Sequence, residues 1–155
     1  MSLLDRSAIE ALLPHRSPIL LLDQVDEFVP GDRLVASRTI GADEPCYRRL
    51  PESARAYPVP LLLESFAQAA GIFWLLSLGE PAGDHLPLLA GLRDCRFSSP
   101  AFPGDVLRHV VRFGRRRQDA AFGMGETSVG GRRIATMGRF LAVRRPRAEV
   151  FRLTT

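Results

Sequence analysis

The chain of 155 residues is long enough to bury the core of one domain and too short for two. Its 46% hydrophobic and 25% charged residues are typical of a globular domain, which excludes disordered, collagen-like and disulfide-framework classes. The net charge is +4, and residues 108–155 carry twelve arginines against three acidic residues. This basic segment indicates either an acidic partner or a solvated arginine-rich face. No RNA-binding, helix-turn-helix or zinc-finger pattern accompanies it, so we expect no nucleic-acid binding.

The N-terminal segment predicts a short helix followed by two strands. Residues 1–13 form an amphipathic pattern that ends at Pro14, so we assign the N-terminal helix to residues 1–14. This pattern does not resemble a targeting sequence. Residues 19–29 predict a strand that ends at a Pro-Gly-Asp turn, and residues 33–40 predict the returning strand. Two cysteines without a signal peptide indicate a reducing, cytoplasmic location.

A long loop, residues 41–59, precedes the most apolar segment of the chain. Pro60 suits the first turn of a helix and Gly79 suits its C-terminal end, so we predict one helix between them. Residues 61–78 reach the lower limit for a membrane span, about 18 residues. Four polar residues interrupt the run, which favours a buried helix of a soluble protein and no membrane partner. Because this helix is apolar on nearly every side, other elements or a partner chain should enclose it, and we expect at least a dimer.

The remainder predicts strands, at residues 88–97, 106–116, 120–129 and 132–143, after a linker over residues 79–87. Gly130 and Gly131 lie between the last two runs and are typical of a hairpin. The basic tail over residues 144–155 is expected to be mobile. The order predicts a single α+β domain over residues 1–155, in which a curved antiparallel β-sheet wraps around one long central helix: a hot-dog arrangement.

Several short motifs carry a resemblance to a known family. They run from about residue 9 to residue 143, and together they resemble the FabZ/FabA-type 3-hydroxyacyl-acyl carrier protein dehydratases of the hot-dog superfamily. The motifs are Leu13-Pro14-His15-Arg16-Ser17-Pro18, Leu20-Leu21-Leu22-Asp23, Pro30-Gly31, Glu44-Pro45, Glu64-Ser65-Phe66-Ala67-Gln68-Ala69-Ala70-Gly71, Leu89-Ala90-Gly91, and Arg96-Phe97 through Pro103-Gly104-Asp105.

The resemblance implies a homodimer or higher homo-oligomer whose acyl tunnel lies between two central helices, with no cofactor and no metal. In the family, a histidine on the loop before the helix takes a proton, and a carboxylate on the partner's helix assists departure of the hydroxyl. Glu64 is the matching carboxylate. Gln68 lies one turn further on the same face. A backbone N–H at the helix start, at Val59, would polarise the carbonyl, and Tyr57 could place a hydroxyl near the site.

The other half of this machinery is not matched. The family's loop reads H-F-P-G-x-P-x-M-P-G, and its histidine position falls on Leu50, or on Arg49 with a one-residue insertion; neither can act as a base. The two loop glycines fall on Ser53 and Val59. We predict that His15, in the N-terminal motif, His85, in the linker, and His109, on a strand, do not readily replace the missing residue.

Three functions follow from these observations. The first is a dehydratase-like enzyme of fatty-acid or polyketide-type metabolism, weak or inactive in standard dehydration. The second is a non-catalytic subunit or acyl-binding partner, paired with a catalytic paralogue as a heterodimer. The third is an acyl thioesterase that uses Glu64. The thioester partner would be an acyl carrier protein or an acyl-CoA. We expect an acidic carrier to dock on arginines near the tunnel mouth, and hairpin geometry predicts two neighbouring sets: Arg115, Arg116, Arg117 and Arg132, Arg133.

Overall fold

The computed structural model describes residues 1–79 and 83–152 of the chain. Its helices and strands are α1 (Arg6–Leu12), β1 (Gln24–Val29), β2 (Arg33–Thr39), the short 3-10 helices η1 (Pro45–Tyr47) and η2 (Glu52–Ala54), α2 (Val59–Leu78), β3 (His85–Phe97), β4 (Val106–Arg116), β5 (Ala120–Val129), β6 (Arg132–Pro146) and α3 (Arg147–Arg152).

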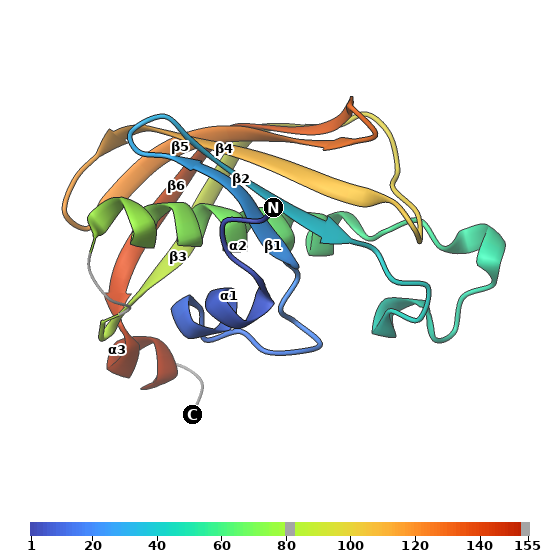
Figure 1. The fold of residues 1–155 in the computed structure, drawn as a ribbon, viewed down its shortest axis with the longest axis horizontal. Helices are drawn as coiled ribbons and strands as arrows, with labels where there is room; N and C mark the ends of the chain where they lie inside the picture. Colours follow the sequence, from blue (N-terminus) through green and yellow to red (C-terminus); the bar gives the residue numbers. More distant parts are fainter. Residues whose placement is uncertain (80–82, 153–155) are drawn as a thin grey trace.

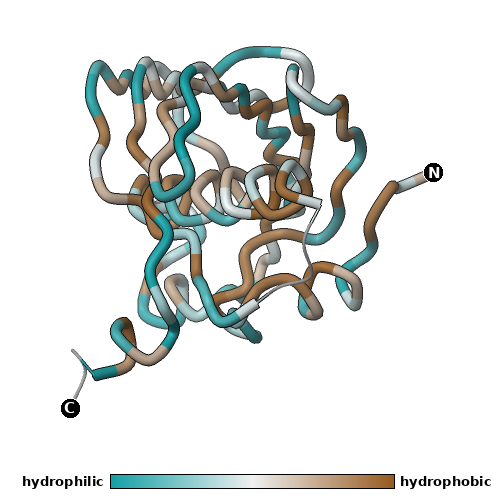
Figure 2. Tube along the Cα trace, turned by 90° about the vertical axis from the view of Figure 1, so that its left-hand side faces the viewer, coloured by the Kyte–Doolittle hydropathy of each residue, from teal (hydrophilic) through white to brown (hydrophobic). Residues whose placement is uncertain are grey.

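All six strands belong to one antiparallel sheet in the order β1-β2-β4-β5-β6-β3. The sheet arches over α2, while α1 and α3 lie on the other side of that helix (Figure 1). Figure 2 looks along α2 and shows the strands curving around it. The predicted α+β hot-dog arrangement is therefore confirmed.

Two glycines on β5, which have no side chains, let the sheet approach the central helix closely. A Cβ atom at Gly125 would lie 2.5 Å from the Phe66 ring, and one at Gly123 would lie 2.3 Å from the Phe140 ring. Both aromatic side chains are fully buried and meet edge to face, with ring centroids 5.7 Å apart. Large rings from α2 and β6 thus occupy the space that β5 leaves open, and this packing fixes the distance between helix and sheet.

The central helix has the predicted ends and the predicted burial. It begins after Pro58 and ends at Gly79, whose φ of +63° is the left-handed conformation that glycine adopts without steric cost. Eleven of its residues are buried. Among the described residues, α2 is the helix long and apolar enough to cross a membrane, and 61% of its most apolar window is buried inside the fold. These properties match the enclosed core helix that the sequence predicts.

One strand prediction is wrong at its start. Residues 19–22 pass beside α2 without joining the sheet; the Asp23 N–H donates to the Ser37 carbonyl of β2, and β1 begins at Gln24. The reason is that side chains of α2 take the backbone groups that a ladder would use: the Leu21 N–H donates to Gln68 Oε1 at 2.8 Å, and the Leu21 carbonyl accepts from Ser65 Oγ at 2.6 Å.

The two chain ends also differ from the prediction. At the N-terminus Asp5 caps α1, and Leu4 pairs with β1 instead of extending the helix. Near the C-terminus β6 continues to Pro146, and residues 147–152 form α3 rather than an irregular tail. His85, assigned to the linker by sequence, starts β3. The predicted mobile tail also includes residues 153–155, which lie outside the described residues.

Candidate functional site

The carboxylate of Glu64 is held by two side chains, one of them a histidine from the N-terminal motif. His15 Nε2 lies 3.3 Å from Glu64 Oε1, and Gln68 Nε2 donates to the same oxygen at 2.9 Å. Glu64 is 37% exposed and His15 is 31% exposed. The pair therefore sits at a surface that another molecule can reach.

Gln68 fixes this arrangement by using its whole amide group. Its Nε2 also donates to the Ile19 carbonyl at 2.8 Å, and its Oε1 accepts from the Leu21 N–H at 2.8 Å. The side chain thus ties the segment after His15 to α2 and orients Glu64 at the same time. Because Gln68 is buried, these bonds are shielded from competing water.

The hydrogen bond from His15 lowers the pKa of Glu64 below its ordinary value; burial opposes that shift, and the hydrogen bond from Gln68 adds to it. Glu64 is therefore ionised at neutral pH in the isolated chain. An ionised carboxylate accepts protons and polarises water, whereas proton donation requires that it first be protonated.

A cavity of about 370 Å³ opens beside this pair. Glu64, His15 and Gln68 supply its polar wall, and the remainder is apolar and comes mainly from α2 and the start of β3: Leu13, Ala67, Gly71, Pro87, Leu88 and Leu89. A polar corner in a mostly apolar cavity is typical of a small-molecule site.

A second histidine meets α2 one residue further on, at Ser65. His109 Nε2 lies 2.7 Å from Ser65 Oγ, and His109 Nδ1 lies 2.8 Å from Thr127 Oγ1. Ser65 Oγ donates to the Leu21 carbonyl, so we assign the Nε2–H tautomer of a neutral His109. All three side chains are fully buried. Burial lowers the pKa of His109 to about 3, and the group joins helix to sheet without reaching the cavity.

The loop before α2, where the family resemblance predicts a histidine, contains none. Residues 41–58 fold through η1 and η2 and project beyond the end of the sheet (Figure 1). Leu50 and Arg49, the two candidates for the matching position, are both exposed. The loop is anchored by Glu44, which is buried, pairs with Arg38 and accepts from the Gly41 N–H at 3.2 Å.

Two predicted substrate-binding residues do not line the Glu64 cavity. Tyr57 is buried at the junction of loop and helix, where its N–H donates to the Ala101 carbonyl at 2.7 Å. Burial raises the pKa of Tyr57 to about 12. Within the described part of the chain, no hydrogen bond reaches its hydroxyl. Val59 is exposed at the start of α2, where its N–H has no intrahelical acceptor.

The two predicted arginine sets are not neighbours, so that prediction of proximity is wrong. Arg117 lies beside Ala120 at one end of β5, and Arg132 pairs with Val129 at the other end. Nine steps along a strand separate these ends by about 30 Å. The reason is that β5 runs antiparallel between the two hairpins, so successive hairpins lie at opposite ends of the sheet.

Strand register places only one of these sets near the cavity. Leu88, in the cavity wall, pairs with Val143, and Val143 pairs with Ala120, the residue beside Arg117. Leu88, Val143 and Ala120 therefore lie side by side on three neighbouring strands, and Arg117 lies at the end of this row. At the far end, Arg133 pairs with Glu126 and Arg132 donates to Ser99.

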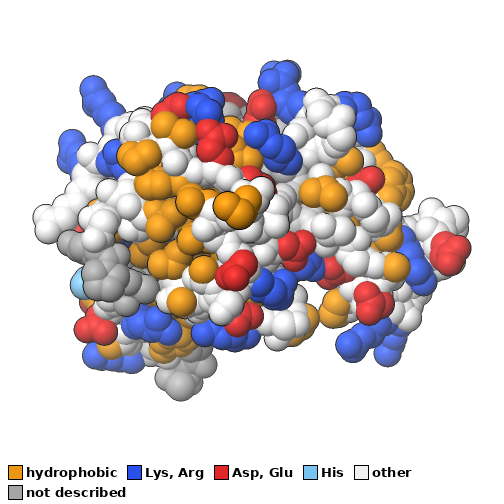
Figure 3. Space-filling view, viewed as in Figure 1, with side chains coloured by type: hydrophobic (Ala, Val, Ile, Leu, Met, Phe, Trp, Pro, Cys, Tyr) orange, Lys and Arg blue, Asp and Glu red, His pale blue; other side chains and the backbone are white. Residues whose placement is uncertain are grey.

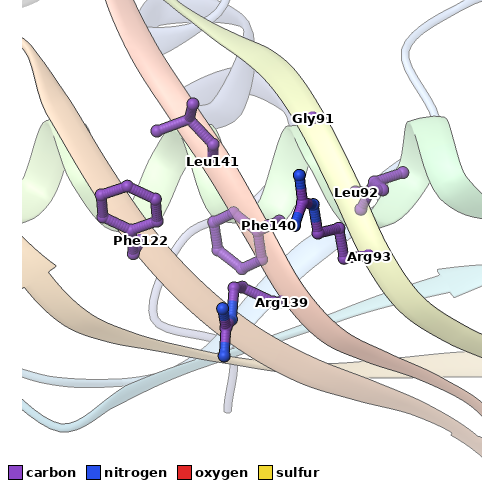
Figure 4. Close-up of a pocket in the computed structure, with 7 residues that line it drawn as sticks. All are labelled: Gly91, Leu92, Arg93, Phe122, Arg139, Phe140 and Leu141. Carbon is purple, nitrogen blue, oxygen red and sulfur yellow. The ribbon is translucent and has the colours of Figure 1, made fainter.

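A further hollow lies on the outer face of the sheet and contains no candidate acid or base. Figure 4 shows its lining residues from β3, β5 and β6, among which Arg93 and Arg139 are the charged ones. Within the described residues, no three His, Cys, Asp or Glu side chains lie close enough to hold a metal. The expectation of no metal and no cofactor stays a prediction.

Sequence reasoning identified Glu64 and Gln68 but set His15 aside. His15 belongs to the N-terminal motif, and 49 residues separate it from Glu64, so no local periodicity could bring the two together. The signal that could have found it is that motif itself, in which the histidine precedes the apolar segment over residues 19–22 by a short Arg-Ser-Pro connection.

Comparisons with known proteins find matches over most of the chain. A FabA-like domain matches residues 13–138. The 3-hydroxyacyl-[acyl-carrier-protein] dehydratase FabZ of Psychromonas ingrahamii is 40% identical over 123 residues, which cover 79% of each chain. The FabZ of Symbiobacterium thermophilum is 40% identical over 119 residues, covering 77% of this chain and 82% of that protein.

Solved structures extend the likeness to nearly the whole chain. The dehydratase heterocomplex ApeI:P from Xenorhabdus doucetiae matches with a TM-score of 0.76 and 26% identity, over 95% of this chain and 97% of that one. The fluoroacetyl-CoA thioesterase FlK shares the fold alone, with a TM-score of 0.63 and 9% identity over 83% of this chain and 96% of that one. The chain therefore belongs to the FabA/FabZ family of hot-dog dehydratases.

Proposed function

We propose that this chain supplies Glu64 to a site for 3-hydroxyacyl thioester dehydration, and that the histidine of that site comes from a second hot-dog chain. One observation carries the proposal. Glu64 is oriented at an accessible cavity by His15 and Gln68, while the loop that should hold the base contains no histidine. The chain thus keeps one half of a two-residue site.

The chemistry assigns one proton transfer to each chain. The partner's histidine would take the proton from the carbon next to the thioester carbonyl, and a carbon–carbon double bond forms as the 3-hydroxyl leaves. Glu64, protonated, would give its proton to that hydroxyl, which departs as water. A partner chain and substrate that cover the cavity would remove water from the carboxyl group, and desolvation raises a carboxyl pKa toward the protonated form.

Two comparisons support the proposal, one for the substrate and one for the second chain. The names of the FabZ relatives specify 3-hydroxyacyl groups on an acyl carrier protein. The ApeI:P dehydratase, similar over nearly the whole chain, is a heterocomplex. Apolar side chains also gather on the face seen in Figure 3, in the region where Figure 1 draws part of α2, which is a surface that a second chain could cover.

A second candidate function rests on the ionised state of Glu64. An ionised carboxylate at a cavity can accept a proton from a water molecule that attacks the thioester, and this attack would release the acyl group. Dehydration by this chain alone, with His15 as the base, is a third outcome. The three differ in their products and in whether they need a second chain.

The test is a mass-resolved assay of the purified chain, alone and with a co-expressed partner. The partners are hot-dog chains of the same genome whose loop retains the H-F-P-G motif, and the substrate is a 3-hydroxyacyl group on acyl carrier protein. We expect no change with the chain alone, and loss of water with a co-purifying partner. Glu64→Gln should abolish that activity in the complex.

The matched control is Ser65→Ala in the same complex, since Ser65 is the next residue of α2 and does not line the cavity. Dehydration by the chain alone at a rate ordinary for the family would overturn the proposal. Loss of the acyl group, dependent on Glu64, would replace it with the thioesterase function.

A further inference from the structure

The hollow on the outer face of the sheet, about 410 Å³ in volume, is separated from the Glu64 cavity by the sheet itself (Figure 4). Three neighbouring strands form it: β3 through Gly91, Leu92 and Arg93, β5 through Phe122, and β6 through Arg139, Phe140 and Leu141. The pairing of β3 with β6 shifts register just before Gly91, and a Cβ atom built at that glycine would meet nothing within 4 Å. A glycine inside a strand is typical of a place where a ligand approaches the backbone.

Two arginines stand directly opposite each other in this outer hollow. Arg93 of β3 pairs with Arg139 of β6, and residues in such positions have Cβ atoms about 5 Å apart. Both are exposed, and like charges directly opposite each other destabilise a sheet. Asp94 follows Arg93 but packs toward Gly138, where a built Cβ atom would lie 2.9 Å from Asp94 Cβ. The fold therefore keeps an unfavourable pair of charges in the hollow.

No acidic side chain neutralises this pair in the part of the chain that the structure describes, since no ion pair or hydrogen bond reaches either guanidinium group. Two other exposed arginines of the same sheet differ: Arg112 of β4 pairs with Asp32, and Arg133 of β6 pairs with Glu126. Figure 4 shows the two side chains of the opposed pair extending in different directions, as expected of groups that repel each other. An anion between them would replace one repulsion with two attractions.

An apolar row borders the opposed arginines on the same face. Leu141 of β6 pairs with Gly91 on one side and with Phe122 on the other, and Phe122 is 46% exposed. This row lies two residues along the strands from Arg93 and Arg139, which is a distance of about 7 Å. The outer hollow thus places a doubly positive group beside an exposed aromatic ring.

We propose that the outer hollow binds a phosphate monoester that carries a flat, largely apolar group, with the phosphate between Arg93 and Arg139 and the flat group on Phe122. Two guanidinium groups match the two negative charges of the phosphate, and each can donate two parallel hydrogen bonds to it. The ring of Phe122 offers a flat apolar surface to the rest of the ligand. Because this site lies across the sheet from Glu64, it does not depend on the function proposed above.

The test measures binding of a small probe to the full chain by calorimetry, at about pH 8, where a phosphate monoester carries two charges. The probe is 1-naphthyl phosphate, and its two halves, inorganic phosphate and 1-naphthol, are titrated separately. We expect the whole probe to bind at least about ten-fold more tightly than either half, because linking the halves makes the second contact intramolecular. Equal affinities for the probe and for inorganic phosphate would show only a general attraction of anions and would overturn the inference.

Three variants each remove one contact. Arg93→Gln and Arg139→Gln should each weaken binding of the probe by about ten-fold, since each removes charge-assisted hydrogen bonds to the phosphate. Phe122→Ala should weaken binding of the probe by about three- to ten-fold and leave binding of inorganic phosphate unchanged. All three side chains are exposed, so the substitutions should leave the fold intact, and circular dichroism checks this.

The matched controls keep the residue type and change its place. Arg133→Gln replaces another exposed arginine of β6, which pairs with Glu126, and Phe102→Ala replaces a phenylalanine that is also 46% exposed but lies outside the hollow. We expect both variants to bind the probe as the unmodified protein does. Equal losses in Arg133→Gln and Arg139→Gln, or in Phe102→Ala and Phe122→Ala, would contradict a site in the outer hollow.

Discussion

Glu64 and Ser65 are consecutive residues of α2, and each contacts a histidine, yet the two contacts differ in what they can do. The pair of Glu64 and His15 is about one-third exposed and lines a cavity. The pair of Ser65 and His109 is fully buried between helix and sheet. The step of one residue turns the side chain by about 100° around the helix, from the cavity to the core.

The difference teaches that a polar contact to histidine indicates chemistry only where a substrate can reach it. At the accessible pair, the hydrogen bond from the histidine lowers the pKa of the carboxyl group. At the sealed pair, burial keeps the imidazole neutral, and each hydrogen-bonding atom has a partner inside the protein. The first pair is suited to proton transfer and the second to fixing the position of α2.

The largest expected effect separates the two residues by activity. In the complex with a partner that supplies the histidine, Glu64→Gln should lower the rate of dehydration by about 10²–10⁴-fold, the usual contribution of an acid or base. Ser65→Ala should leave the rate within about a few-fold of normal, because it removes no group from the cavity. Steady-state kinetics on both variants checks this, and equal losses would show that the sealed pair also controls the chemistry.

The free energy of unfolding should depend on the buried pair of Ser65 and His109 and hardly on the accessible pair of Glu64 and His15. His109→Gln should lower the free energy of unfolding by about 1–3 kcal/mol, since it disturbs buried hydrogen bonds at both ends of the imidazole. Glu64→Gln should change it little, because that side chain is partly exposed. Urea unfolding of both variants makes the measurement. An unchanged free energy of unfolding in His109→Gln would mean that the buried hydrogen bonds of His109 do not stabilise the packing of α2 on the sheet.

The sealed histidine also predicts a pH dependence of stability. The pKa of His109 is about 3 in the folded protein, below the ordinary value of about 6.5 in the unfolded chain. As the pH falls below 6.5, only the unfolded chain gains this proton, so stability decreases by up to about 1.4 kcal/mol per pH unit. His109→Gln should remove this slope between pH 6 and pH 4, roughly, whereas Thr127→Val should lower stability without removing it. If the slope of stability against pH is unchanged in His109→Gln, the pH dependence comes from other titratable groups.

A smaller effect is expected at the accessible pair when the histidine is replaced. His15→Asn removes the main cause that lowers the pKa of Glu64, so that pKa should rise. Carbon-13 NMR of the Glu64 carboxyl group across an acid titration follows the change. His85→Asn, at an exposed position on β3, is the matched control and should not change the titration of the Glu64 carboxyl group. A Glu64 pKa that stays constant in His15→Asn would show that Gln68 alone sets it.

The smallest effect concerns carrier docking, and it compares the two ends of the sheet. We expect the triple variant of Arg115, Arg116 and Arg117 to Ser to weaken binding of acyl carrier protein by about three- to ten-fold at low salt. The pair Arg132→Ser and Arg133→Ser, at the end away from the Glu64 cavity, should have a weaker effect. The affinities of the two variants and the unmodified protein for acyl carrier protein should become similar at physiological salt, where exposed charges are screened over about 8 Å. Equal losses in both variants would show that docking does not depend on distance from the cavity.

The sequence by itself determined the architecture and singled out Glu64 as the candidate acid. Alternating apolar patterns, the Gly130-Gly131 hairpin and the ends of α2 at Pro60 and Gly79 are local signals, and each describes groups close together in the chain. Glu64 was found because a carboxylate on an apolar helix is costly without a purpose, and because it lies in a family motif. These features need no knowledge of which segments meet.

Only the tertiary structure decided what surrounds Glu64. His15 reaches it from 49 residues away, and Leu21 bonds to α2 instead of to a strand. The two arginine sets separated for a related reason, since antiparallel strands carry successive hairpins to opposite ends of the sheet. Contacts between distant segments depend on how the sheet curves around α2, and that curvature is set by packing among many residues rather than by any local pattern.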